Sequence, residues 1–295
     1  MVNTFQINYD NYISITRTQC NCIITMKSVK NLSIFQIILI LFGGLILLFV
    51  VAPILSMCLS TSVKTLVKTA AEEEVYKSIW LTLWTSMVAT IVFSILAVPF
   101  AYLLARKDFP FKRLICGIID VPIVIPHSAA GIALLGVVSR NSIAGEAASK
   151  IGINFIDHPI GIMIAMAFVS LPFLINGARE GFESVPLQLE KTAYTLGASQ
   201  TKVFFTISIP LAWRAILSGF VMMWGRGLSE FGTIVIIAYY PMVTAVLIYN
   251  RFTAYGLKYA QPVAVLFVIA CLIIFIFLRL LSIERKKKNN LIRYK

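Results

Sequence analysis

Apolar runs of about 20 residues recur along this chain, and no other feature restricts its possible folds as strongly. Six of these runs are long enough to cross the hydrocarbon core of a bilayer: residues 34–59, 79–105, 114–138, 160–178, 211–238 and 262–282. Backbone groups in lipid must be satisfied within the protein, and the runs lack the strict alternation of barrel strands. The sequence therefore predicts an all-α integral membrane protein with six transmembrane helices.

The charge distribution indicates how the chain is oriented in the membrane. Only 13% of its residues are charged, against roughly 25% in soluble domains. If the N-terminus is cytoplasmic, the segments on that side hold 17 of the 26 Lys and Arg residues and the opposite loops hold 7. The excess predicts a multi-pass protein of the cell membrane with both termini cytoplasmic. The net charge of +13 lies largely beside the spans, so we expect contact with an anionic bilayer and no nucleic-acid partner.

Composition divides the chain into three parts. Residues 1–33 form a polar N-terminal arm, residues 34–282 a six-helix membrane domain, and residues 283–295 a basic tail, with the arm and the tail predicted to be cytoplasmic. The first 25 residues do not resemble a cleavable signal, and Met26 is an alternative start. The other interpretation is a translated arm without fixed structure.

Residues 184–210 are polar and glycine-containing, and they lie between the fourth and fifth apolar runs, on the predicted cytoplasmic side. Pro186 suits the start of a short helix whose apolar residues recur at i, i+4 and i+7: Leu189, Ala193 and Leu196. Gly197 is expected to end this helix, and a second short helix is expected to run to Pro210, where the fifth span opens. We call residues 184–210 the elbow.

Two charged residues lie within the fifth apolar run. Arg226 and Glu230 are four residues apart, so they share a helical face and can form an ion pair. A pair that fixes helix packing is favoured over a direct substrate contact. Both remain candidates for a transport pathway or its gate, because ionisable residues inside a membrane need a partner or an aqueous wall.

The third apolar run contains further polar candidates around two prolines. Asp120, His127 and Ser128 flank Pro122 and Pro126, which interrupt a helix and free backbone groups. His127 is expected to pack or to form hydrogen bonds, since no second histidine is placed to share a metal. The small residues that follow, Gly131 among them, permit close helix approach at an interface or a narrow pathway.

Sequence motifs for catalysis and nucleotide binding are absent from the 295 residues. The chain contains no G-x-x-x-x-G-K-[ST], H-E-x-x-H or G-x-S-x-G. Its five cysteines include only a C-x-C pair, so we expect neither a disulfide framework nor a bound metal. We therefore expect no catalytic residue and no cofactor on this chain, and any energy from ATP must come from a partner.

The elbow resembles the cytoplasmic EAA motif of ABC importer permeases, which runs E-A-A, three residues, Gly, nine residues and I-x-L-P. Gly197, Ile207 and Pro210 keep this spacing, while Lys191 and Thr192 stand where the motif has Glu and Ala. Three further stretches resemble archaeal-type molybdate/tungstate permeases: "DVPIVIPHSAAGIALL", "REGFESVP" and "SEFGTIVIIAYYPMVTAVLIY". The resemblance extends over residues 46–281.

This resemblance implies a type I (MetI-like) ABC importer permease fold and a homodimer. It further implies two cytoplasmic ATPase subunits that hold ATP and Mg, and an extracytoplasmic oxyanion-binding protein. The elbow would be the coupling helix that inserts into a cleft of the ATPase. The residues expected to make this contact are Leu189, Glu190, Lys191, Thr192, Ala193, Tyr194, Leu196, Gly197, Ala198 and Ser199. From the residues alone, a helix that merely lies on lipid fits equally well.

The function implied by the resemblance is import of tungstate or molybdate by alternating access. A permease for sulfate or another oxyanion of the same superfamily is the nearest alternative. An ion channel or an intramembrane enzyme is a more distant one, since a channel needs no ATPase-docking elbow and the chain has no recognisable catalytic constellation.

Overall fold

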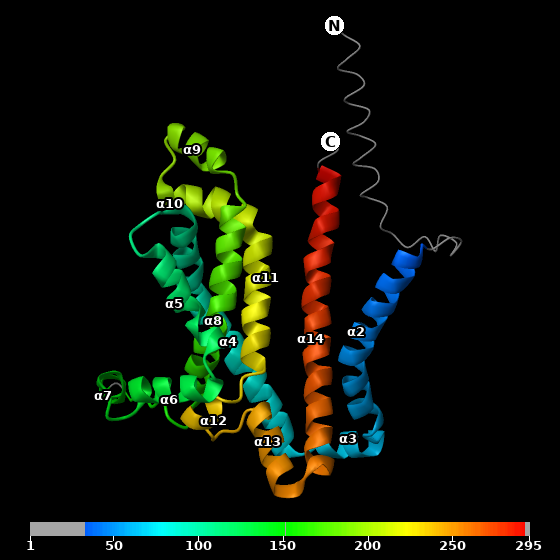
Figure 1. Cartoon of the computed structure of the whole chain (residues 1–295). Helices are drawn as coiled ribbons and strands as arrows, with labels where there is room; N and C mark the ends of the chain where they lie inside the picture. The colour runs from blue at the N-terminus through cyan, green and yellow to red at the C-terminus, as the bar shows by residue number, and fades with distance from the viewer. Residues whose placement is uncertain (1–32, 151, 293–295) are drawn as a thin grey trace. The chain divides into compact units, whose positions relative to one another are not determined.

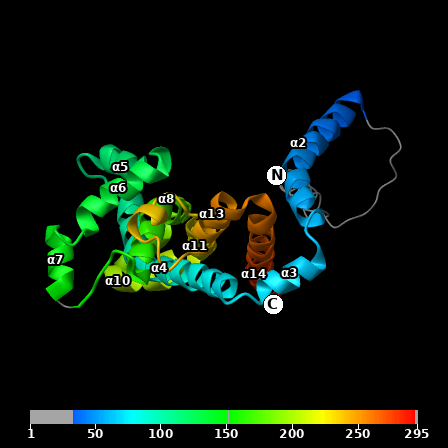
Figure 2. The same cartoon turned by 90° about the horizontal axis from the view of Figure 1, so that it is seen from below.

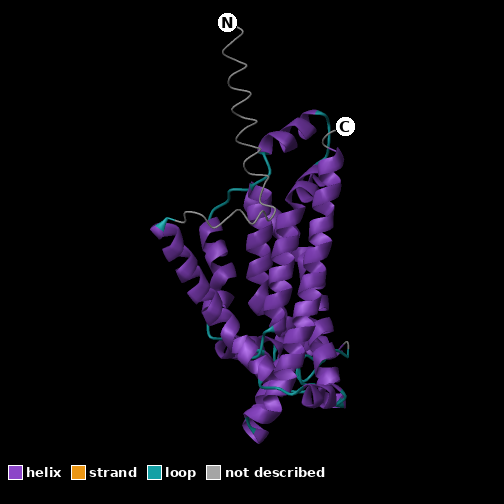
Figure 3. Ribbon diagram, turned by 90° about the vertical axis from the view of Figure 1, so that its right-hand side faces the viewer, coloured by secondary structure: helices purple, strands orange, loops and turns teal. Residues whose placement is uncertain are grey.

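A computed structural model describes residues 33–150 and 152–292, with side chains described as far as Ile276. Every regular element in these residues is a helix (Figure 3). The predictions for residues 1–25 and for Met26 lie outside the described residues. Internal contacts divide the chain into two compact units at Ser56–Met57. The described part of the first unit is most of α2 (Ile34–Leu59), an apolar helix with no buried residue that coincides with the first predicted span.

Long apolar helices of the second unit confirm three more of the predicted spans. These are α4 (Glu73–Arg106), α8 (Pro159–Glu183) and α14 (Leu257–Ile292). The backbone of α14 continues as helix well into the basic C-terminal segment. By length and composition the described residues contain five helices able to cross a membrane, or six if one bent pair counts as a single span. The chain is therefore a multi-pass membrane protein.

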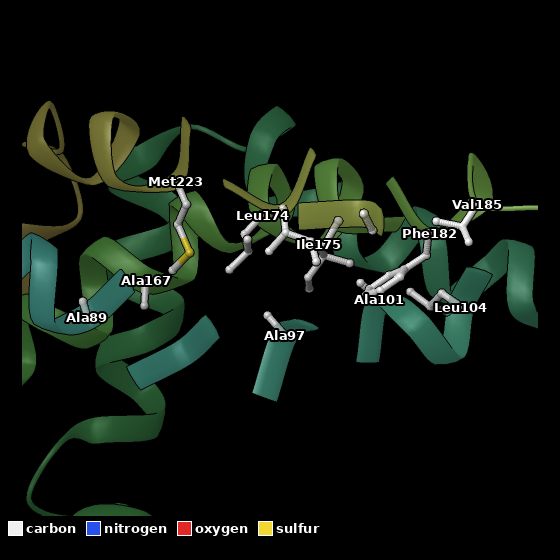
Figure 4. Close-up of a cluster of buried hydrophobic side chains, with 13 residues drawn as sticks. Ala89, Ala97, Ala101, Leu104, Ala167, Leu174, Ile175, Phe182, Val185 and Met223 are labelled. Atoms are coloured by element: carbon white, nitrogen blue, oxygen red, sulfur yellow. The ribbon is translucent and has the colours of Figure 1, made fainter. Parts of the chain in front are cut away.

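The core of the second unit is built around α8, which packs along both α4 and α11 (Ile209–Leu228). Figure 2 shows these three helices in the middle, with α5 and α6 on one side and α13 and α14 on the other. Side chains from α4, α8 and α11 form the largest buried apolar cluster, which includes Leu104, Leu174, Phe182 and Met223 (Figure 4). This cluster sets the positions of the helix ends that carry the elbow.

Glycines allow the backbones of α8 and α11 to approach closely. A Cβ atom built on Gly177 would lie 3.0 Å from Cα of Gly219 on α11. One built on Gly219 would lie 3.2 Å from the carbonyl oxygen of Leu174. Helix pairs in membranes gain their packing energy from such close contact, because burial from lipid supplies little driving force.

The third predicted span is sharply bent. Its two halves, α5 (Lys112–Val124) and α6 (His127–Val138), meet at 114°. Ile125 takes an extended conformation, with φ −70° and ψ 146°, because the following Pro126 disfavours the helical region for the residue before it. The prediction that prolines interrupt this run is confirmed, and the run forms two helices.

The fifth predicted span has different ends from those expected. A continuous helix runs from Gln200 to Leu228, made of α10 (Gln200–Val203), the π-helical turn η1 (Phe204–Ser208) and α11. Within η1 the N–H of Ile209 bonds to the carbonyl of Phe204, and this wider turn admits Pro210, which has no N–H to donate. The prediction of a separate helix ending at Pro210 was therefore wrong. So was continuation of the span to residue 238, because the helix stops at Leu228 and only the short α12 (Ile234–Ile237) follows.

Shorter helices complete the second unit. α3 (Val63–Ala70) and α13 (Thr244–Tyr255) pack against α14, and α7 (Ile143–Lys150) follows α6. α9 (Leu187–Thr195) lies crosswise to α8 and α11 at their elbow end (Figure 1). The elbow thus lies at one end of the bundle, and the turn between α11 and α12 lies at the other.

Candidate functional site

The first helix of the elbow forms where the sequence predicts it. Pro186 precedes α9 in an extended conformation, with φ −59° and ψ 123°, and the helix begins at Leu187. Gly197 has φ +82°, which an L side chain rarely adopts, and it ends the helix. The N–H of Gly197 bonds to the carbonyl of Tyr194, and the N–H of Ala198 bonds to that of Ala193. These two bonds form a Schellman motif, which satisfies the last carbonyls of α9.

The second part of the elbow starts with a side-chain cap. The Oγ of Ser199 accepts a hydrogen bond from the N–H of Lys202 at 3.3 Å and begins α10. From this point the helix is continuous with α11. The elbow therefore leads directly into a helix that extends through the bundle.

Several large apolar side chains of the elbow are exposed, although polar residues of α9 are exposed beside them. Leu196, which follows α9, is 83% exposed, and Leu189 is 46% exposed, whereas Leu187, 51% exposed, borders a cavity between α4 and α9. Tyr194 is also exposed and borders that cavity. Exposed apolar groups that gather in this way are typical of a surface that meets a partner or a membrane.

The inner surface of α9 carries a buried acid. Glu190 is 3% exposed, and one of its carboxylate oxygens accepts hydrogen bonds from Nη2 of Arg106 at 2.8 Å and from Nε at 3.0 Å. The same oxygen accepts from the hydroxyl of Ser208 at 2.8 Å, and the other accepts from Tyr102 at 3.2 Å. Arg106 also donates to the carbonyl of Val185. The Arg106–Glu190 pair thus connects α4, the start of the elbow, α9 and η1.

Burial makes this network sensitive to the loss of one partner. The side chains of Arg106 and Glu190 are only 7% and 4% exposed, so each charge depends on the other in a site with little water. Removing one member of such a pair costs about 3–5 kcal/mol, because the remaining charge is left buried. Glu190 therefore acts inside the subunit and holds α9 in place.

The other predicted elbow contacts lie mostly on the surface. Ala193 and Ala198 are half-buried, and the exposed ones are Lys191, Thr192, Gly197 and Ser199, in addition to the apolar residues above. Lys191 lines a cavity between α4 and α9. The sequence could not reveal that Arg106, Tyr102 and Ser208 meet Glu190, since only folding brings these segments together.

The predicted pathway residues gather at the other end of α11. Nη2 of Arg226 lies 3.1 Å from Oε2 of Glu230 and 2.6 Å from Nε2 of His127. The ion pair predicted from the four-residue spacing is confirmed, although α11 ends at Leu228 and Glu230 follows in a turn. His127 forms hydrogen bonds, as expected. Because a guanidinium has only donors, the imidazole nitrogen accepts in this contact.

Backbone contacts extend this cluster to the turn between α11 and α12. The other carboxylate oxygen of Glu230 accepts from the N–H of Thr233 at 2.9 Å, and the hydroxyl of Thr233 donates to the carbonyl of His127. Gly131 is buried against this turn, where an added Cβ would lie 3.2 Å from Cα of Thr233. Ser128 is exposed beside the cluster. The cluster therefore joins the bend between α5 and α6 to the end of α11.

Two polar contacts join α5 to α8, and the sequence did not pair the residues that make them. Asn176 donates to Asp120 at 2.7 Å, and Arg179 lies 3.1 Å from the sulfur of Cys116. Asp120 had been noted beside the prolines, but its partner lies on another helix. All four residues are partly buried, so these contacts fix the bent third run against α8.

Comparison with known proteins agrees with this architecture. Residues 97–286 match the family described as binding-protein-dependent transport system inner membrane component. The molybdate/tungstate transport system permease protein WtpB of Thermococcus kodakarensis is 47% identical over 189 residues, covering 64% of this chain and 71% of that protein. A probable sulfate transport system permease protein of Marchantia polymorpha is 33% identical over 179 residues, covering 59% of this chain and 62% of that protein.

A solved structure supports the same fold. A chain of a bacterial alginate ABC transporter, in complex with an alginate pentasaccharide-bound periplasmic protein, superposes with a TM-score of 0.66. The alignment covers 84% of this chain and 94% of that chain at 17% identity, so it shows a common fold and nothing finer. The family match includes the last turns of α4, all of α8 and α11, the elbow and the cluster at Arg226. This chain belongs to the family of binding-protein-dependent transport system inner membrane components.

Proposed function

We propose that this chain is the membrane-spanning subunit of an ATP-driven importer that carries molybdate or tungstate into the cell. The carrying observation for the substrate is the 47% identity to a molybdate/tungstate permease. Identity to the sulfate permease is lower and covers less of that protein, so sulfate is the second candidate. Both substrates are tetrahedral oxyanions, and an extracytoplasmic binding protein would make most of the selection between them.

The observation that best supports ATP-driven transport is the arrangement of exposed and buried side chains on α9. This helix exposes leucine side chains and buries an acid, the reverse of an isolated surface helix. A separate ATPase subunit would receive the exposed leucines in a cleft. Glu190 would then transmit a movement of α9 to α4 and η1 through its hydrogen bonds. ATP and Mg would be bound by that partner. Two copies of this chain and two ATPase subunits would form the transporter, with both termini of this chain cytoplasmic.

This arrangement favours a mechanism in which a movement of α9 is transmitted along α11 as a rigid body. When the ATPase subunits close on ATP, they would move α9, and the continuous helix from Gln200 to Leu228 would carry that motion along the bundle. At the far end of this helix lies the cluster of His127, Arg226 and Glu230. We assign this cluster to a gate, where it fixes α11 against the bend before α6. A direct oxyanion contact is the less favoured role, because Glu230 already compensates the charge of Arg226.

Reconstitution tests the proposal. The chain, its ATPase and its binding protein are placed in liposomes, and uptake of tungstate, molybdate and sulfate is measured with and without ATP. We expect ATP-dependent uptake of molybdate and tungstate in preference to sulfate. Preference for sulfate would overturn the substrate assignment, and flux without ATP or ATPase would favour a channel.

A surface variant tests the docking role of α9. Leu196→Glu places a charge at the most exposed apolar position of the elbow and should abolish most ATPase binding, measured by copurification. The matched control is Val67→Glu on α3, which is also exposed but lies at the opposite end of the bundle (Figure 1). If ATPase binding survives in Leu196→Glu, or is lost equally in the control, α9 is not the docking helix.

A further inference from the structure

A cavity of about 460 Å³ lies between the last turns of α4 and the inner side of α9. Its volume is within the roughly 300–1,000 Å³ typical of small-molecule sites. Pro99 and Leu103 supply apolar lining, and three cationic residues border it: Arg106, Lys107 and Lys191. The only acid that lines it is Glu190, which is buried and already bonded to Arg106. The cavity is therefore cationic.

Two of these cations are available to a ligand. Lys107 and Lys191 are exposed, and neither has an ion-pair partner among the residues whose side chains are described. Lys191 occupies a position where the EAA motif has an acid, so this chain has a positive charge at a point where a negative one is usual. An anionic ligand would be attracted by both lysines and by Arg106.

The depth of the cavity in the membrane follows from α4. Residues 78–105 contain no charged side chain, and at about 1.5 Å per residue they extend roughly 40 Å. The hydrocarbon core is about 30 Å thick and a bilayer with its headgroups about 40–45 Å. Arg106 and Lys107 therefore lie at the level of the lipid headgroups, and so does the cavity that they border.

An apolar surface leads to this cavity along α4. Exposed apolar side chains recur on one side of the helix at spacings of three and four residues from Ile91 through Val92 and Ile95 to Leu96, and Leu103 follows two turns later. The surface ends at Lys107. A cationic cavity at headgroup level, continuous with an apolar helix face, is complementary to an amphiphile with an anionic head and a hydrocarbon tail.

We propose that this cavity binds the phosphate headgroup of an anionic phospholipid, with an acyl chain along the exposed face of α4. Lys107 and Lys191 contact the phosphate, and Leu103 contacts the first part of the chain. The bound headgroup lies directly beside Arg106, which holds Glu190 and with it α9. A lipid is thus part of the surroundings that position the elbow.

Lipid binding to the purified full-length chain tests the proposal. Native mass spectrometry in detergent measures the affinity for phosphatidylglycerol relative to phosphatidylcholine. We expect the wild-type chain to prefer phosphatidylglycerol, and Lys107→Glu and Lys191→Glu each to lower that preference about tenfold, because each replaces an attraction with a repulsion. The matched control is Lys202→Glu, an exposed residue of α10 that does not line the cavity, and its preference should stay within about twofold of wild type.

Three outcomes would overturn the proposal. Equal loss in Lys202→Glu would show attraction to the general surface charge, and absence of any preference in the wild type would show that the cavity takes no anionic lipid. Displacement of the lipid by an equal concentration of inorganic phosphate would show that a free anion is the ligand. The assay uses neither ATPase nor oxyanion, so its failure would leave the proposed transport function untouched.

Discussion

The continuous helix from Gln200 to Leu228 has an arginine–glutamate pair near each end, and the two pairs differ in their exposure to water. Near Ser208 the Arg106–Glu190 pair is sealed, with side chains 7% and 4% exposed. At the other end Arg226 is 23% exposed and its neighbour His127 40% exposed, although Glu230 is fully buried. The same ion-pair chemistry therefore occurs once in a closed setting and once in an open one.

This difference indicates different roles. The sealed pair connects four elements and both of its members are buried, so it suits transmission of force. The open pair includes a half-exposed histidine and an arginine within reach of water, so water can replace its contacts. A transporter that alternates between two states needs both a rigid connection and a contact that can be remade. Variants of each pair test this comparison.

The largest effect is expected at the sealed pair. Arg106→Ala should lower the free energy of unfolding by about 3–5 kcal/mol, because Glu190 is left buried without its cation. Unfolding in detergent measures this change, and Arg113→Ala, an exposed arginine on α5, is the control. The double variant Arg106→Met with Glu190→Leu should recover most of the loss. If the single variant is as stable as the control, the pair does not hold the elbow.

A smaller loss is expected at the open pair. Arg226→Ala should lower the free energy of unfolding by about 2 kcal/mol, since water can partly replace the guanidinium beside Glu230. Combining it with Glu230→Ala should recover part of both stability and uptake. Arg214→Ala on the same helix, an exposed residue without an ion pair in the described side chains, is the control. Absence of recovery in the double variant would point instead to direct contact of Arg226 with the transported anion.

The next largest effect is expected at Gly197, in the turn of the elbow. Gly197→Val forces a β-branched residue to φ +82° and should cost about 1–2 kcal/mol locally. The expected result is uncoupling, in which ATP hydrolysis continues while uptake falls and the membrane fold is retained. Gly117→Val on α5, where an added Cβ meets no atom and φ is not positive, should leave coupling unchanged. Normal coupled uptake in Gly197→Val would contradict the role of the elbow.

The smallest effect is expected at a single hydrogen bond of the open cluster. Thr233→Val removes the donor to the carbonyl of His127 and should cost about 0.5–1.5 kcal/mol. Thermal unfolding measures the change. Thr253→Val is the control, since the hydroxyl of Thr253 bonds only within its own helix. An equal effect in both variants would show that the bond between the turn and α6 adds nothing to the open cluster.

Local patterns predicted much of the elbow and of the spans. Pro186 and Gly197 mark the ends of α9 because their backbone preferences act on the residues beside them. The pairing of Arg226 with Glu230 followed from a spacing of four residues. The size of the bend at Ile125 did not follow, because prolines show where a helix breaks but packing decides the angle.

Taken alone, the sequence determined that this is a helical membrane protein with a glycine-ended elbow, since lipid burial and local backbone preferences act over short stretches. Tertiary structure alone decided that Glu190 points inward to Arg106, that His127 joins Arg226, and that Pro210 lies within one continuous helix. These features depend on which helix faces meet, and residues as far apart as Arg106 and Glu190 carry no local signal of their contact. The direction in which α9 faces is therefore a property of the folded bundle.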